Sequence, residues 1–381
     1  MRILVAASGY DSREKHEVNI FALDQAKALR DAGHDVRFAA VDTRSIRHSR
    51  PWGCYRYTLD GIPVYYASVP CGALPLGLPE LAGRLAASGI CRAIAKDGWK
   101  PDIVHAHFLG VAAIAAPVCR EKNLPLVITE HTSALNVPDP GAALVKTMRK
   151  TYPLADALLA VSSLLAGSIL RCTGERATVV PNIIDTQSFG AVKESNVPGK
   201  PFRFAASGFL LHRKGYDLLL HAAGELCRRG YDLTLTVFGD GPERETLEKL
   251  AETEGIRGRV DFRGQCTRKE LGDAYAQMDA FVLASRRETF GVVYIEAMAV
   301  GLPVIATRCG GPEDFVTEEN GILIPVDDES ALTGAMERMM LRREDYDSAA
   351  ISADTRRRFA PKTVAAQLTE IYTAVFENRG H

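Results

Sequence analysis

The sequence predicts an α/β protein that consists of two doubly wound domains of parallel strands. Short apolar runs, typical of buried parallel strands, alternate along the chain with stretches of helical periodicity. A polar segment with Pro and Gly, residues 192–201, separates two such cycles. A length of 381 residues also suits two domains.

The first cycle begins at the start of the chain. Arg2–Ala7 is a strand pattern, Ser8–Glu17 is expected to be a polar loop, and a helical stripe then ends at Gly33. Further strands are expected at Val36–Val41, Ile62–Ala67, Asp102–His107, Leu126–Thr129, Ala157–Val161 and Thr178–Val180. Helices are expected at Pro79–Lys96 and Val111–Glu121.

The second cycle begins with a strand at Arg203–Ser207. Its other strands are expected at Leu233–Phe238, Val260–Arg263, Ala280–Ala284, Pro303–Thr307 and Gly321–Pro325. An amphipathic stripe from Val364 to Phe376 predicts a C-terminal helix. Ligands of doubly wound sheets bind beyond the carboxyl ends of the strands, so we expect the active site in the cleft between the domains.

Composition predicts a cytoplasmic globular protein. Hydrophobic residues make up 46% of the chain and charged residues 24%. The apolar run at the start of the sequence is too short for a signal peptide. No apolar run approaches the roughly 20 residues of a membrane span. The 8 cysteines include no Cys-x-x-Cys pair, which favours reduced thiols. A pI near 6.8 argues against nucleic-acid binding.

The small net charge of −1 is divided unevenly. Residues 1–188 carry 21 Lys and Arg against 17 Asp and Glu, a net charge of +4, and the remainder carries 25 against 30, a net charge of −5. Arginines and aromatic residues cluster in the first half: Arg44, Arg47, Arg50, Trp52, Tyr55, Arg56 and Tyr57. Either this cluster meets an anionic acceptor or a lipid headgroup surface, or it is a solvated loop.

The strongest functional signal is the stretch Ser285–Gly301. It comes directly after the expected strand Ala280–Ala284, and a helix is expected to begin near Gly291. Unpaired N–H groups at such a helix start, around Phe290 and Val292, attract phosphate.

Glu296 lies inside that helix among apolar and small residues, so we expect the helix to be buried. A buried carboxylate needs hydrogen-bond donors. The two hydroxyl groups of a ribose would supply them, and so would an Arg or Lys of a neighbouring strand.

Glu288 and Glu296, inside Glu-Thr-Phe-Gly-…-Glu-Ala-Met-Ala-…-Gly-Leu-Pro-Val, resemble the donor signature of retaining glycosyltransferases that use nucleotide sugars. The match is to family 4, whose fold is GT-B. This long motif implies that Glu288 contacts the transferred sugar and that Glu296 holds the ribose. It also places Thr289 and the helix start beside the donor.

The GT-B resemblance implies a domain plan. Residues 1–188 would form the acceptor-side domain and residues 189–361 the donor-binding domain. The last helix, about residues 362–381, would cross back onto the first domain.

Three further motifs of the second half resemble the same family. The loop from Gly208 to Arg213-Lys214-Gly215 resembles one whose two cations hold the donor diphosphate. Such cations would stabilise the negative charge that grows on the phosphate as the sugar–phosphate bond breaks. The turn Phe238-Gly239-Asp240-Gly241-Pro242 resembles one that faces the cleft. Val260–Gly264 resembles a strand whose end receives the base, through the backbone of Arg263.

In the first half of the chain, the candidate functional residues are histidines and residues of the first loop. His131 ends an expected strand, and the resemblance implies that it lies near the donor sugar, although a structural role is the alternative. For the His105-Ala-His107 pair a structural role is favoured, since no pattern of a metal-dependent barrel follows. In the first loop, the candidates for acceptor contact are Gly9, Arg13, Lys15 and His16.

The chain has no Walker motif, and Asp345-Tyr-Asp347, formally a metal motif of another glycosyltransferase fold, lies far from any strand end. The resemblance implies that neither a metal nor another cofactor is required, with UDP or GDP as product.

The sequence thus predicts transfer of a hexose or N-acetylhexosamine to a carbohydrate or lipid-linked acceptor in glycan, polysaccharide or glycolipid assembly. A basic first domain further suggests peripheral contact with the inner face of a membrane. Alternatives are a nucleotide-sugar epimerase on the same fold and a non-catalytic nucleotide-sugar-binding protein. A dinucleotide oxidoreductase is disfavoured, because no Gly-x-Gly-x-x-Gly follows the first strand.

Overall fold

The computed structural model describes residues 1–11, 16–42, 53–69, 78–190 and 201–380 of the chain. The chain divides into two compact units. Unit 1 consists of Met1–Ile183 and Pro361–His381, and unit 2 is Ile184–Ala360. The first segment of unit 1 thus ends at Ile183, five residues before the domain boundary at residue 188 that the sequence suggested. Nearly all of the expected linker lies outside the described residues.

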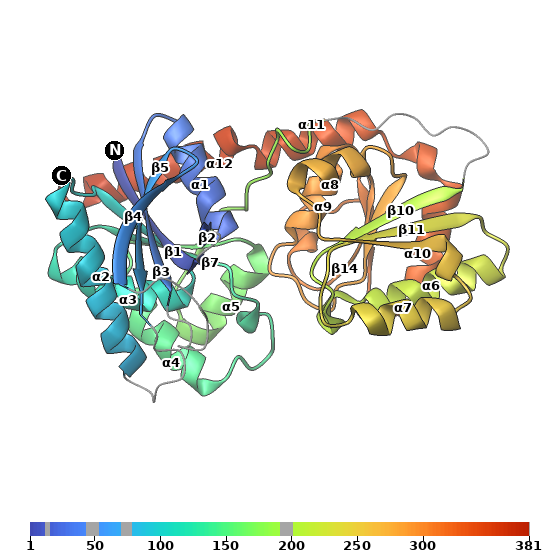
Figure 1. Cartoon of the computed structure of the whole chain (residues 1–381), viewed down its shortest axis with the longest axis horizontal. Coiled ribbons are helices and arrows are strands. Elements are labelled where there is room, and N and C mark those ends of the chain that lie inside the picture. Colours follow the sequence, from blue (N-terminus) through green and yellow to red (C-terminus); the bar gives the residue numbers. More distant parts are fainter. Residues whose placement is uncertain (12–15, 43–52, 70–77, 191–200, 381) are drawn as a thin grey trace. The chain divides into compact units, whose positions relative to one another are not determined.

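A mostly parallel sheet forms the centre of unit 1 (Figure 1). The strand order is β4-β5-β3-β1-β6-β7-β8-β9, and β2 pairs with β1. The pairs β1–β2 and β4–β5 are antiparallel, and the others are parallel. The strands are β1 Arg2–Asp11, β2 His16–Val18, β3 Asp35–Asp42, β4 Gly53–Leu59, β5 Ile62–Ser68, β6 Ile103–His107, β7 Leu126–Glu130, β8 Ala157–Ala160 and β9 Thr178–Val179.

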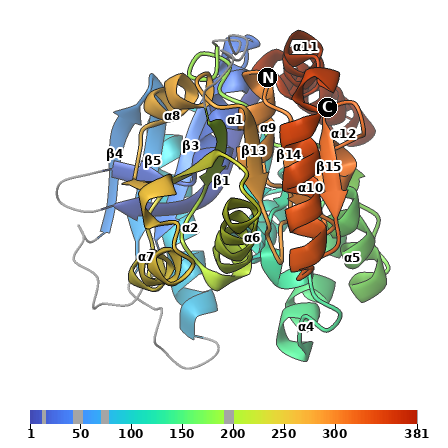
Figure 2. The ribbon, with the colours of Figure 1, turned by 90° about the vertical axis from the view of Figure 1, so that its right-hand side faces the viewer.

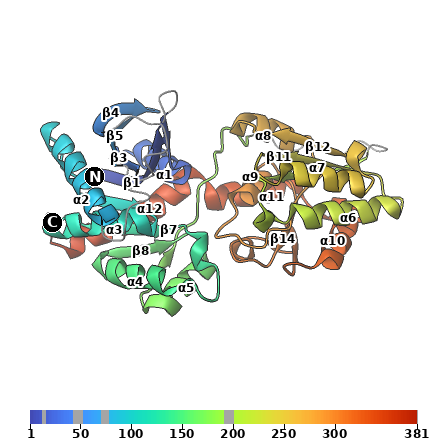
Figure 3. The ribbon, with the colours of Figure 1, turned by 60° about the horizontal axis from the view of Figure 1, so that its bottom comes forward.

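Helices cover both faces of this sheet (Figure 1). They are α1 Ile20–Asp31, α2 Leu78–Lys96, α3 Leu109–Glu121, α4 Ala142–Thr151, α5 Ser163–Thr173 and α12 Pro361–Asn378. Helices α1 and α12 lie side by side on one face, and α2 and α3 pack together on the other. Helices α4 and α5 pack near β8 (Figure 3).

Two segments of unit 1 differ from the expectation. The expected loop Ser8–Glu17 instead contains the end of β1 and the start of β2, which form an antiparallel hairpin in which Gly9 pairs with Val18. Strand β4 was not expected at all. Its residues alternate between exposed and half-buried, because it lies at the edge of the sheet, so it lacks the continuous apolar run that marks a central strand.

The C-terminal helix α12 completes the core of unit 1. Its residues Val364, Leu368 and Tyr372 are fully buried in one cluster with the sheet and α1. The Tyr372 hydroxyl also hydrogen-bonds Nδ1 of His105 at 2.6 Å, which ties the helix to strand β6. Removal of this helix would therefore expose the apolar face of unit 1.

Unit 2 contains a fully parallel sheet in the order β12-β11-β10-β13-β14-β15. The strands are β10 Phe202–Ser207, β11 Leu233–Phe238, β12 Val260–Gly264, β13 Ala280–Leu283, β14 Val304–Thr307 and β15 Gly321–Ile324. The helices are α6 Tyr216–Arg228, α7 Arg244–Thr253, α8 Arg268–Tyr275, α9 Val292–Ala299, α10 Glu329–Leu341 and α11 Ser348–Phe359. Figure 2 shows α6 and α10 side by side, and α9 packs against α8 and α11.

Within the described residues, no helix is both long and apolar enough to cross a membrane.

Candidate functional site

Each sheet reverses its winding direction at one point. In unit 2 the reversal lies between β10 and β13, and in unit 1 it lies between β1 and β6. The loops that leave such neighbouring strands diverge, and the crevice beyond the carboxyl ends is where ligands of open α/β sheets bind. Several of the residues that the sequence marked as functional, among them Lys214, Glu288 and His131, follow these strands or an immediate neighbour.

A buried ion pair lies at the reversal point of unit 2. Lys214, after β10, donates from Nζ to Oε1 of Glu288, after β13, at 2.5 Å. The residues are only 9% and 6% exposed. The Ser285 hydroxyl donates to the same carboxylate oxygen at 2.9 Å. A buried charge of this kind is stable only with such partners.

Glycines allow the loops around this pair to approach closely. Gly215 has a φ of 69°, and a Cβ there would lie 1.9 Å from the carbonyl oxygen of Ala284. Gly291, with a φ of 91°, precedes the first residue of α9, and a Cβ there would lie 2.7 Å from the ring of Tyr294. Only glycine combines a positive φ with the absence of a Cβ atom, so only glycine fits at these two positions.

The two predicted cations differ in their surroundings. Lys214 is buried in the ion pair, whereas Arg213 is exposed, and its guanidinium has no ion-pair partner in the part of the chain that the structure describes. Its backbone carbonyl accepts a hydrogen bond from the N–H of Arg286 at 2.8 Å. Arg213 is therefore available to an anionic ligand.

Arg286 holds this loop in place, a role that the sequence did not suggest. Its guanidinium donates to both carboxylate oxygens of Asp217, at 2.8 and 2.7 Å, and to the carbonyl of His212 at 2.6 Å. The hydrogen bonds to Asp217 raise the pKa of Arg286 above its already high usual value. Because Asp217 and His212 lie 69 and 74 residues away in the chain, no local motif reveals these contacts.

A small pocket lies beyond the ends of β10 and β11. Its volume is about 300 Å³, and it is lined by Ser207, Gly208, Phe209, Phe238, Gly239, Asp240, Gln265, Cys266, Leu271 and Val293. Gly239 has a φ of 119°, and a Cβ there would lie 2.1 Å from the carbonyl oxygen of Gly208. The Gly239 N–H also donates to the carbonyl of Gly264 at 2.7 Å. Backbone thus forms much of the pocket wall.

The other predicted donor residues lie near these loops. Glu296 is buried on α9, and burial of Tyr275, together with the charge of Glu296, keeps the pKa of Tyr275 well above its usual value. The Tyr275 hydroxyl donates to Oγ of Ser207 at 2.6 Å. Arg263 is exposed at the end of β12 and pairs with Asp261.

The residues around the start of α9 differ in how deeply their side chains are buried. Phe290 is 3% exposed and packs against Phe315 and Phe359, so its side chain belongs to the core of unit 2. Thr289 and Val292 are half-buried. At Phe290, only the backbone remains for contact with a ligand.

In unit 1, His131 lies directly after β7 and next to a second buried histidine. Nδ1 of His107 and Nε2 of His131 share a hydrogen bond of 3.0 Å. The ring of Phe21 stacks on that of His131 with centroids 6.0 Å apart, and the Phe108 ring is tilted against it with centroids 4.8 Å apart. Burial lowers the pKa of His131 to about 3, so its imidazole is neutral at pH 7. Nδ1 of His131 has no partner among the described residues.

Glu130 anchors the loop that carries His131, and sequence reasoning missed it. It is fully buried and accepts hydrogen bonds from the N–H groups of His131, Thr132 and Leu109, at 2.8, 2.8 and 2.9 Å. The Tyr152 hydroxyl donates a fourth at 2.8 Å. Burial raises the pKa of Glu130 despite these donors.

His105 and His107 differ in their contacts. His105 is hydrogen-bonded to Tyr372 and to Oγ1 of Thr129, at 2.6 and 2.7 Å, which fits a structural role. His107 instead contacts His131, the predicted site residue.

The acceptor-side candidates are described only in part. Gly9 is buried, and a Cβ there would lie 2.8 Å from Cβ of Ala40. Arg13 and Lys15 lie outside the described residues, as does the side chain of His16.

Most of the arginine and aromatic cluster is also outside the described residues, since Arg44, Arg47, Arg50 and Trp52 all fall there. Arg56 is described, and it forms an ion pair with Asp97 at 2.5 Å. Its charge is therefore already partly balanced within unit 1.

Comparison with known proteins identifies the family. Residues 191–356 match the family described as glycosyl transferases group 1, and residues 18–188 match glycosyltransferase family 4. A GDP-mannose-dependent alpha-mannosyltransferase of Mycobacterium tuberculosis is 32% identical over 348 residues, which cover 84% of this chain and 84% of that protein. A D-inositol 3-phosphate glycosyltransferase of Xylanimonas cellulosilytica is 28% identical over 402 aligned positions, which cover 95% of this chain and 92% of that protein.

Solved structures show the same fold. A sucrose-phosphate synthase from Thermosynechococcus elongatus superposes with a TM-score of 0.79 at 20% identity, over 99% of this chain and 100% of that one. An Anabaena protein solved in complex with UDP-glucose gives a TM-score of 0.72 at 20% identity, over 98% of this chain and 100% of that one. The chain therefore belongs to glycosyltransferase family 4 and has the GT-B fold of two Rossmann-like domains.

Proposed function

We propose that this glycosyltransferase transfers a hexose or an N-acetylhexosamine from a nucleotide-diphospho-sugar to a hydroxyl group of a carbohydrate or lipid-linked acceptor, with retention of configuration. The observation that supports it best is the buried Lys214–Glu288 pair at the reversal point of the unit 2 sheet, next to the exposed Arg213. The related mannosyltransferase is named as GDP-mannose-dependent, and the Anabaena protein was solved with UDP-glucose.

Unit 2 would hold the donor. Arg213 and Lys214 would contact the diphosphate, together with the N–H groups of residues 290–292 at the start of α9. When the bond between the anomeric carbon and the phosphate oxygen breaks, negative charge grows on that phosphate. Fixed cations stabilise this charge more than they stabilise the ground state, which lowers the barrier.

The nucleoside would lie over the bare backbone of Gly208 and Gly239. Glu296 would accept hydrogen bonds from the ribose hydroxyls, and the backbone of Arg263 would contact the base. Contact through the backbone of Arg263 alone would not distinguish UDP from GDP by a side chain of that residue.

Glu288 and His131 would orient the transferred sugar. Because burial keeps the imidazole of His131 neutral, His131 would act through a hydrogen bond and not through charge. The acceptor oxygen would attack the anomeric carbon from the side on which the phosphate departs. The acceptor proton would pass to that phosphate, so that the products are the glycosylated acceptor and a nucleoside diphosphate. Gly9, Arg13, Lys15 and His16 would line the acceptor side.

We propose that no metal or other cofactor takes part, since Arg213 and Lys214 would supply the positive charge at the diphosphate. Activity in excess EDTA should equal activity with Mg²⁺ or Mn²⁺. A requirement for either ion would contradict this part of the proposal.

The test of function is a donor screen. The protein is incubated with UDP-, GDP- and ADP-sugars, first alone and then with sugar, inositol phosphate and lipid-linked acceptors, and the products are resolved by mass spectrometry. Transfer to an acceptor with release of nucleoside diphosphate supports the proposal. Isomerised donor without acceptor would instead indicate an epimerase, and binding without turnover of any mixture would indicate a non-catalytic binding protein.

We also propose that the protein is cytoplasmic and contacts the inner face of a membrane through the basic first half of the chain, whose net charge is +4. Co-sedimentation with vesicles should rise with phosphatidylserine content and fall as salt is added. Equal sedimentation with neutral vesicles would contradict an electrostatic contact.

A further inference from the structure

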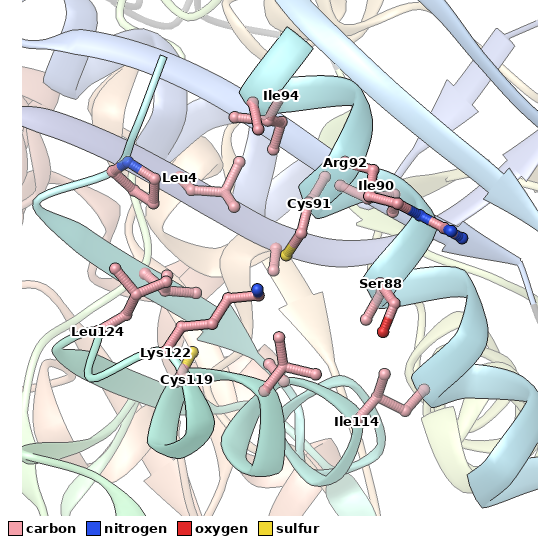
Figure 4. A pocket seen from close by; sticks show the side chains of 18 of the residues that line it. Leu4, Ser88, Ile90, Cys91, Arg92, Ile94, Ile114, Cys119, Lys122 and Leu124 are labelled. Atoms are coloured by element: carbon pink, nitrogen blue, oxygen red, sulfur yellow. The ribbon is translucent and has the colours of Figure 1, made fainter. Parts of the chain in front are cut away.

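A larger cavity lies in unit 1, and none of the residues assigned to donor or acceptor binding lines it. It is bordered by α2, α3 and the face of the sheet formed by β1, β3 and β6, and its volume is about 910 Å³ (Figure 4). This volume falls in the range of about 300–1,000 Å³ that is typical of small-molecule sites.

Small side chains on three sides create this cavity. The sheet contributes Ala6 and Ala39, α2 contributes Ala87 and Ser88, and α3 contributes Ala115. Larger residues at these positions would fill the space between the helices and the sheet. The cavity is therefore a consequence of the sequence of three separate elements.

Most of the wall is apolar. Its Leu, Ile and Val side chains are Leu4, Val41, Leu85, Ile90, Ile94, Val104, Val111, Ile114, Val118 and Leu124. Cys91 and Cys119 add two thiols, and burial raises the pKa of both, so they are neutral at pH 7. A wall of this kind favours a hydrocarbon over a sugar or a nucleotide.

The charged residues of the wall are mainly cations. Arg92, Lys100 and Lys122 line the cavity, against the single carboxylate of Glu121. These three cations have no ion-pair partner in the described ranges. Figure 4 shows the ammonium group of Lys122 directed into the cavity near Cys91. An anionic group bound there would meet unpaired positive charge.

We propose that this cavity binds a single-chain anionic amphiphile, with the alkyl chain among the aliphatic side chains and the anionic head at Lys122. A fatty acid has this chemistry. The proposal does not depend on glycosyl transfer, because none of the residues assigned to donor or acceptor lines the cavity.

Trp99 lines the cavity, so its fluorescence should report ligand binding. The chain has 2 tryptophans, so the variant Trp52→Phe leaves Trp99 as the sole reporter. Octanoate, decanoate and laurate, each below its micelle concentration, are titrated while Trp99 fluorescence is followed. We expect saturable binding with a Kd that falls about fourfold for each added methylene until the chain fills the cavity. Fluorescence that never saturates, or a Kd independent of chain length, would overturn the proposal.

Matched variants test the location of the site. Ala115→Phe places a ring in the cavity, whereas Ala113→Phe makes the same change on the same helix at a residue that does not line it. We expect laurate binding at least about tenfold weaker for Ala115→Phe and changed less than twofold for Ala113→Phe. Ser88→Leu fills the cavity from α2 and replaces Ala115→Phe if circular dichroism shows that the latter is unfolded. Equal affinity in folded filled and control variants would overturn the proposal.

A further pair of variants tests the anionic head. Lys122→Ala should weaken laurate binding by about two- to fivefold, as expected for one partly exposed ion pair, and leave binding of dodecanol unchanged. Lys96→Ala, on α2 but outside the wall, is the control. If wild type binds dodecanol as tightly as laurate, the assignment of an anionic ligand is wrong.

Discussion

Lys214 and Glu288 form an ion pair with an N–O distance of 2.5 Å, and each comes from a loop on a different side of the reversal point in the unit 2 sheet. The pair is buried, so each charge depends on the other. The two residues proposed to meet the leaving phosphate and the sugar are thus already fixed with respect to each other.

Removal of one partner should destabilise unit 2. We expect Lys214→Ala to lower the free energy of unfolding by about 3–5 kcal/mol, because the carboxylate of Glu288 stays buried without its cation. The double variant Lys214→Ala/Glu288→Ala should recover part of this loss. Urea denaturation of the wild type, both single variants and the double variant measures the coupling. A single variant within about 1 kcal/mol of the wild type would show that the pair contributes little.

Arg213 permits a test of catalysis without loss of stability. Its guanidinium is exposed, so Arg213→Ala should change the free energy of unfolding by less than about 0.5 kcal/mol. Turnover should nevertheless fall about 10²–10³-fold, as for loss of one group that stabilises transition-state charge. Steady-state kinetics with saturating donor measures this effect. Arg338→Ala, on α10, is the control, and equal losses in both variants would exclude a specific role for Arg213.

Glu296 should govern the affinity for the nucleotide. We expect Glu296→Ala to weaken nucleoside diphosphate binding by about 1.5–3 kcal/mol, the range of hydrogen bonds to a charged group. Calorimetry with UDP or GDP and with the matching 2′,3′-dideoxy nucleotide separates the contact to ribose from other effects. The dideoxy compound should bind the wild type and Glu296→Ala with similar affinity. If Glu296→Ala weakens both nucleotides equally, Glu296 acts on the fold and not on the ribose.

The buried histidines predict the pH dependence of stability. Burial lowers the pKa of His105 and of His131 to about 3 and that of His107 well below its usual value. In the unfolded chain these groups bind protons near pH 6.5, so stability is constant above that pH and falls as the pH drops toward 3. His105 and His131 should each cost about 2 kcal/mol at pH 5 relative to pH 7.

Urea denaturation at both pH values measures this cost, and His105→Asn should lose about 2 kcal/mol less than the wild type on acidification. His34, whose side chain is only half-buried, provides the control variant His34→Asn, with a smaller change. An unchanged pH dependence in His105→Asn would show that His105 is not the group that resists protonation.

Central strands and the donor loops were predictable because their signals are local. The apolar run before Ser285 predicts β13, and Gly291 predicts the start of α9. Both signals determine the structure of the residues directly beside them in the sequence. The motif around Glu288 and Glu296 identified the family for the same reason. Strand β4 was missed because an edge strand keeps only one face partly covered.

Residues that act through distant partners could not be predicted. Arg286 and Asp217 are 69 residues apart, and Tyr152 reaches Glu130 over 22 residues, so nothing near either residue in the sequence indicates the contact. The cavity between α2 and α3 is a similar case. It depends on Ala6 and Ala39, which pair on neighbouring strands, and on Ala115 of α3 lining the same space. Small residues in three separate elements look ordinary until the elements pack.

Helix α12 has a consequence for how the protein is made. The first 183 residues leave the ribosome long before the helix that fills their core, because the whole of unit 2 is translated in between. During synthesis the nascent first domain therefore carries an open apolar groove where Leu368 and Tyr372 will later lie. Unit 2 can therefore fold first, and residues 1–183 complete their core only once α12 has been synthesised.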